Sequence, residues 1–141
     1  MSELIVYLGL KAASSIAVGR GLDLTGNYDS TPQKELIRFT IDESKKTNRI
    51  FVYRQTKGKG KGFIKYESGL REEFYAPVDN FSWQDGGISR MVVSDFNDDG
   101  ISDVLFYNNS RSGMMLTYDK KQDRFLLVPV RIESQKTDTS K

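Results

Sequence analysis

The sequence predicts an all-β fold, because short runs of strand-forming residues alternate with turn signals and long helical periodicity is absent after residue 40. The runs are residues 50–54 (IFVYR), 63–66 (FIKY), 91–93 (MVV), 104–107 (VLFY), 114–118 (MMLTY) and 125–130 (FLLVPV). A turn is expected at Ser112 and Gly113. Before residue 40 the pattern is weaker. Residues 8–18 are compatible with a helix or a strand and residues 33–38 with a short helix, so neither is assigned.

The predicted strands repeat along the chain. Aromatic residues of two segments align at offsets of 54, 52 and 51 positions: Tyr53 with Tyr107, Tyr66 with Tyr118, and Phe74 with Phe125. Each unit reads as strand, turn, strand, turn, strand, over residues 42–90 and 91–132, and a degenerate third unit precedes them. A period slightly above 50 residues is typical of a propeller blade. Residues 1–132 are thus expected to form one domain, and the polar residues 133–141 a disordered tail.

Each unit is predicted to be a small antiparallel sheet that is apolar on both faces, because Val104, Leu105, Phe106 and Tyr107 place large side chains on alternate sides. Such a sheet must be covered on both sides, and stacking the units around an axis would do so. Closed propellers use four to eight blades, so this chain would need further copies of itself or a larger protein to complete one. The alternative is a single β-sandwich with two similar hairpins.

Composition excludes most catalytic chemistry. The chain has 141 residues, a formal net charge of +2, no cysteine and no histidine. Thiol nucleophiles, thiolate zinc sites and histidine bases are therefore impossible, and we expect no enzyme activity. The longest apolar run near the amino terminus, residues 4–8, is too short for a membrane span and has no basic residue before it, so neither an anchor nor a signal peptide is expected.

An acidic loop is the clearest candidate site. Residues 95–103 follow the pattern D-x-N-x-D-G-x-x-D. Calcium prefers six to eight hard oxygen ligands, and this spacing lets alternate side chains of a tight loop converge on one ion. Gly100 would take the sharp turn, and a cation would relieve the repulsion between the carboxylates. The predicted ligands are Asp95, Asn97, Asp99, the carbonyl of Ile101, and Asp103. A solvated acidic turn is the alternative.

The segment from residue 93 to residue 107, VSDFNDDGISDVLFY, resembles the FG-GAP or VCBS repeat, the calcium-binding blade unit of integrin-like β-propellers. The resemblance is clearest over residues 91–130. It implies a structural Ca²⁺ ion and a binding module that is lectin-like or binds a protein surface. The preceding loop, residues 42–48, has Lys45 and Lys46 where ligands would stand, so one metal site is expected. The calcium site suggests a secreted or extracellular role, although the sequence leaves the compartment open.

Two further segments are candidate ligand sites. Trp83, with Asp85 close by, would offer a sugar-stacking ring and hydrogen-bonding groups, unless the ring is buried. Every charged side chain from residue 44 to residue 66 is basic, and Lys57, Lys59 and Lys61 alternate with glycines there. That stretch is either a solvated hairpin loop or a binding surface for nucleic acid or another polyanion. A purely architectural subunit is the third alternative.

Overall fold

The computed structural model describes residues 4–9, 15–19, 21–32, 34–42, 44–54, 61–65, 71–75, 79–84, 88–108 and 111–133, with the backbone alone for 61–65 and 71–75. These residues form strands and no helix, so the all-β prediction is confirmed. No helix among them is long and apolar enough to cross a membrane.

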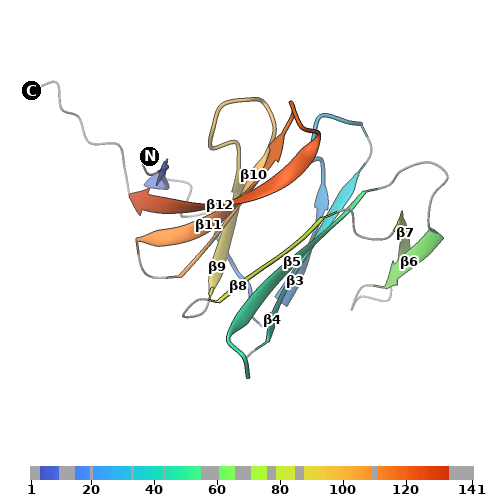
Figure 1. Cartoon of the computed structure of the whole chain (residues 1–141), viewed down its shortest axis with the longest axis horizontal. Helices are drawn as coiled ribbons and strands as arrows, with labels where there is room; N and C mark the ends of the chain where they lie inside the picture. The colour runs from blue at the N-terminus through green and yellow to red at the C-terminus, as the bar shows by residue number, and fades with distance from the viewer. Residues whose placement is uncertain are drawn as a thin grey trace, which may run out of the picture.

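Two sheets form the body of the molecule (Figure 1). The first has the order β1-β12-β11-β10-β9-β2 and the second the order β3-β4-β5-β8. The strands of the first are β1 (Ile5–Tyr7), β2 (Ile16–Ala17), β9 (Arg90–Ser94), β10 (Asp103–Tyr107), β11 (Ser112–Asp119) and β12 (Arg124–Glu133). Those of the second are β3 (Gly21–Gly26), β4 (Glu35–Asp42), β5 (Thr47–Arg54) and β8 (Asp79–Gln84). All neighbours pair antiparallel except β1, which runs parallel to β12.

The two sheets pack face to face through one apolar cluster. Phe39 of β4 stacks on Phe106 of β10 with ring centroids 4.8 Å apart. The inward side chains of both sheets join this cluster: Ile37, Phe39, Ile50 and Val52 from the second sheet, and Met91, Val104, Phe106, Leu116, Tyr118 and Phe125 from the first. Face-to-face packing of four-stranded antiparallel meanders is common to β-sandwiches and to neighbouring propeller blades.

Strand β10 confirms the prediction of a sheet with two apolar faces, because all five of its residues are buried. Val104 and Phe106 belong to the cluster between the sheets, whereas Leu105 and Tyr107 belong to a second cluster on the other face. That second cluster includes Val6 of β1, so the amino-terminal strand, at the edge of the first sheet, extends this apolar outer face.

The strand pairing differs from the repeat expected from the sequence. Strands β6 (Lys61–Lys65) and β7 (Arg71–Tyr75) form a separate two-stranded sheet, drawn apart from the two larger ones in Figure 1. The strand next to β5 is instead β8, in a segment where no strand was predicted. The alternation of half-buried and exposed side chains in β8 explains this, since it gives the strand one apolar face. Aromatic spacing alone could not show which strands pair.

Ser112 and Gly113 are a second correction, because they begin β11 and do not form a turn. Gly113 lies opposite Tyr107 on β10. A Cβ atom at Gly113 would meet the carbonyl oxygen of Phe106 at 2.5 Å and the Cδ1 atom of Ile132 at 3.1 Å. Glycine is therefore needed here for close packing. Glu133, expected in the tail, is the last residue of β12, and the rest of the predicted tail lies outside the described residues.

Candidate functional site

The acidic loop connects β9 to β10 and folds around the side chain of Asp95. The Asp95 carboxylate accepts hydrogen bonds from the backbone N–H groups of Asp99, at 3.2 Å, and Gly100, at 2.7 Å. Two residues adopt positive φ, Asp98 at 58° and Gly100 at 83°. Glycine and aspartate tolerate that conformation better than other residues do. The sharp turn predicted at Gly100 is thus present.

Asp103 holds the end of the loop against the sheet. Its side chain is buried, and its two oxygens accept hydrogen bonds from the Thr117 hydroxyl at 2.7 Å and from the Phe96 N–H at 3.0 Å. Burial raises the pKa of the Asp103 carboxyl; those two hydrogen bonds oppose the rise, and the carboxylates of Asp99 and Asp95 add to it. The carboxylates of Asp95 and Asp99 therefore repel the buried carboxylate of Asp103 within a single loop.

The predicted calcium ligands all lie in this loop, but their oxygen atoms are not gathered at one point. Asp99 is exposed and accepts a hydrogen bond from the N–H of Ile101 at 2.9 Å, while Asn97 is exposed too. Among the residues that the structure describes, no group of three or more acidic side chains is arranged to hold a metal ion. The chemistry of the set still suits calcium, since every donor is a hard oxygen. Coordination would require the side-chain oxygens of Asp95, Asp99 and Asp103 to move together around one ion.

A buried group of charges lies elsewhere, where the second sheet meets the first. Glu35 of β4 is fully buried, and its Oε1 atom accepts hydrogen bonds from the N–H groups of Tyr28, at 2.5 Å, and Asp29, at 3.0 Å. Its Oε2 atom has no hydrogen-bond partner among the described residues. Burial raises the pKa of Glu35 from 4.5 to about 7; the Tyr28 N–H opposes the rise and the charge of Asp29 adds to it.

Arg54 of β5 links this group to the first sheet. Its Nε atom lies 3.0 Å from Oδ2 of Asp29, an ion pair by distance, although the N–H is not aimed at that oxygen. Its Nη2 atom donates to Asp123 at 3.0 Å. The guanidinium also lies 5.4 Å from the ring centroids of both Tyr118 and Phe125. One feature of the sequence could have indicated this cluster. Side chains alternate along a strand, so Glu35 lies on the same face of β4 as the inward-facing Ile37 and Phe39.

Trp83 is a core residue. It lies on β8 opposite Asn48, with its ring centroid 6.2 Å from that of Phe39 and 6.4 Å from that of Phe106. The ring therefore packs against the core between the two sheets and is partly buried. A role for Trp83 in ligand binding stays a prediction.

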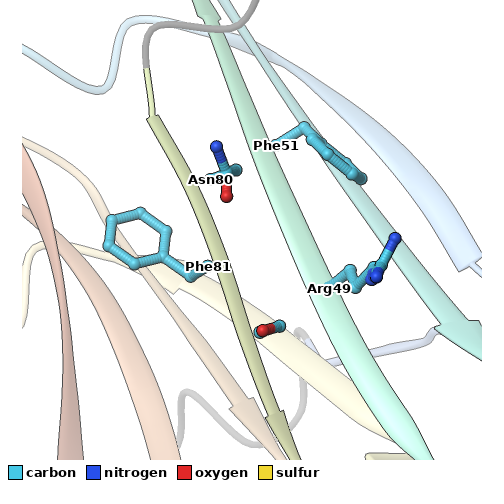
Figure 2. A pocket seen from close by; sticks show the side chains of 5 residues that line it. Arg49, Phe51, Asn80 and Phe81 are labelled. Atoms are coloured by element: carbon cyan, nitrogen blue, oxygen red, sulfur yellow. The ribbon is translucent and has the colours of Figure 1, made fainter. Parts of the chain in front are cut away.

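The other face of β8 and β5 carries a shallow hollow of about 150 Å³. Its lining residues are Arg49, Phe51, Asn80, Phe81 and Ser82. Arg49 pairs with Ser82, and Phe51 with Asn80, in the register of the two strands, so these four side chains share one face. Figure 2 shows Arg49 and Phe51 on the same side of β5, and the Phe81 ring on the opposite side of β8.

The remaining predicted site residues fall largely outside the described residues. Asp85, Lys57 and Lys59 lie there. Lys61 begins β6 and pairs with Tyr75, and its side chain is not described. In the loop before β5, Asp42 accepts hydrogen bonds from Ser44 and from the N–H of Lys45, which closes a hairpin turn.

The chain matches no protein-family model, no curated protein sequence and no solved structure. The resemblance to the FG-GAP or VCBS repeat therefore stays a prediction.

Proposed function

We propose that this protein is a non-catalytic binding module in which the acidic loop binds one Ca²⁺ ion. The observation that supports this most is the repulsion that Asp95 and Asp99 exert on the buried carboxylate of Asp103. A divalent cation at the centre of the loop would convert that repulsion into attraction, because the ion's charge outweighs each carboxylate.

The position of Asp103 suggests what the ion would do. Asp103 is the register partner of Ser94 on β9, and its carboxylate accepts a hydrogen bond from the Thr117 hydroxyl on β11, so this residue of β10 connects three neighbouring strands. An ion held by Asp103 together with Asp95 would fix the exposed loop to these strands. Its role in the proposal is therefore structural: it orders one end of the first sheet.

Thermal unfolding with and without calcium tests the proposal. Extracellular calcium modules bind with dissociation constants of about 10⁻⁴ to 10⁻³ M. Calcium at about 100 times the dissociation constant stabilises the folded state by about 2.7 kcal/mol, which raises the melting temperature of a domain of this size by about 10 °C. In Asp99→Ala the calcium-dependent rise should disappear. Equal melting temperatures of the wild type in chelator and in excess calcium would refute the proposal.

Asp98→Asn is the matched control. It removes one negative charge from the same loop at a position that is not a predicted ligand, and asparagine tolerates the positive φ of residue 98. The calcium-dependent rise should remain in this variant. If both variants lose the calcium-dependent rise in melting temperature, that rise depends on the total charge of the loop and not on the predicted ligands.

A further inference from the structure

We infer that the hollow on the outer face of β5 and β8 is a subsite for a carboxylated sugar, such as a uronic acid unit of a glycan. This inference rests on the proposed function as a binding module and names a ligand class for it. The site lies on the second sheet, whereas the acidic loop belongs to the first, so the two can be tested separately.

Arg49 supplies the charge. The other two arginines on β4 and β5 are engaged: Arg38 forms a two-pronged ion pair with Asp23, at 2.7 and 2.8 Å, and Arg54 contacts Asp29 and Asp123. Arg49 is exposed, and no described acidic side chain lies within ion-pair distance of it. A free guanidinium presents a planar fork of donors that matches a carboxylate in geometry and charge.

The neighbouring side chains suggest a sugar more than an acidic side chain of a protein. Asn80 and Ser82 are exposed, have no side-chain hydrogen bond to another described residue, and stand directly across from Phe51 and Arg49. An amide and a hydroxyl both donate and accept, as sugar hydroxyls require. The half-buried Phe51 offers an aromatic face for the apolar side of a sugar ring. An acidic side chain of a protein, which only accepts hydrogen bonds, would leave the acceptor groups of Asn80 and Ser82 unused.

The size of the hollow and the charge of its lining limit the kinds of ligand that fit it. A hollow of about 150 Å³ is well below the 300 to 1,000 Å³ of pockets that enclose drug-sized molecules, so it suits one ring of a longer glycan. One guanidinium balances the single negative charge of a carboxylate. A phosphate dianion would leave a charge unmatched by the described lining residues.

Chemical-shift perturbation on the ¹⁵N-labelled full chain tests this, with D-glucuronate as the probe, D-glucose as the neutral analogue and inorganic sulfate as the anion without a ring. We expect saturable shifts for glucuronate at the Arg49 Nε–H, the Asn80 side-chain amide and the Ser82 N–H. The dissociation constant should be about millimolar, as for other small weak ligands. Glucose and sulfate should each bind at least tenfold more weakly.

Variants complete the test. Arg49→Gln should weaken glucuronate binding at least tenfold, and Arg49→Lys should weaken it several-fold because the charge stays but the fork is lost. Arg124→Gln, which removes an exposed arginine from the first sheet, should leave it unchanged. The inference is overturned if glucuronate gives no saturable shift at about ten times the expected dissociation constant, if glucose or sulfate binds equally well, or if Arg49→Gln binds normally. Such a result with calcium binding intact would leave the proposed function standing.

Discussion

Replacing Glu35 with glutamine should change how the stability of the protein depends on pH. Glu35 is fully buried, and its pKa is raised from 4.5 to about 7. The folded chain therefore holds this proton more tightly than the unfolded chain does. The stability that Glu35 contributes is fully present below pH 4.5 and is lost as the pH rises to about 7, where it levels off.

The size of the effect follows from that shift. One pKa unit corresponds to 1.36 kcal/mol, so a rise from 4.5 to about 7 is a loss of about 3 kcal/mol between acidic and neutral pH. The sequence contains no histidine, so no other side chain has an ordinary pKa between 5 and 8. Charges facing Glu35 are Asp29 and, beyond it, Arg54 with Asp123.

Urea unfolding at a series of pH values between 4.5 and 8 measures this, with fluorescence of Trp83, the single tryptophan, as the probe. Wild-type stability should fall by about 3 kcal/mol over this range on account of Glu35, and Glu35→Gln should remove that fall. Glu133→Gln is the control, because it removes a glutamate whose side chain is 27% exposed and paired only with Arg131 among the described residues. A wild-type profile that stays flat above pH 5.5, or that Glu35→Gln does not alter, would refute the reasoning.

Two further outcomes are expected. Gly113→Ala should lower the free energy of unfolding by about 1 to 3 kcal/mol, because the added methyl group meets the Phe106 carbonyl oxygen at 2.5 Å. Gly26→Ala should cost less, because its nearest neighbours are atoms of the Tyr28 ring at 3.5 Å, an ordinary contact distance. Urea unfolding that shows the opposite order would contradict this explanation of Gly113. The repeat period predicts a multimer, so sedimentation equilibrium should give a mass that is a multiple of 16.0 kDa. A monomer at every concentration would contradict a propeller completed by several copies of this chain.

The all-β fold and most strands of the first sheet could be predicted from local patterns. Strands β9 to β12 were all anticipated, and the four apolar residues of β10 divide between two faces as their alternation requires. Strand pairing could not be predicted, because the local sequences of β5, β6 and β8 do not show which strands are hydrogen-bonded to one another. Which of them lie side by side depends on contacts distant in sequence, such as Asn48 with Trp83.

The candidate sites also divide into one that the local sequence predicts and others that depend on contacts between distant residues. The acidic loop could be recognised from the spacing of its acidic residues, because the whole loop is one continuous segment of the sequence. The hollow beside Arg49 joins residues up to 33 positions apart, from Arg49 to Ser82. In the buried group around Glu35, Arg54 contacts Asp123, which is 69 positions away. Only the sheet register brings these side chains together. No strand was predicted around Trp83, because the polar residues beside it, which are the exposed side chains of β8, hide the alternation with the half-buried ones.

Calorimetric titration of the wild-type chain with calcium tests the central claim most directly. The account predicts saturable binding of one Ca²⁺ ion per chain, retained in Asp98→Asn and lost in Asp99→Ala, with a dissociation constant at or below about 10⁻³ M. Absence of binding heat at several temperatures, together with an unfolding curve unaffected by calcium, would contradict it.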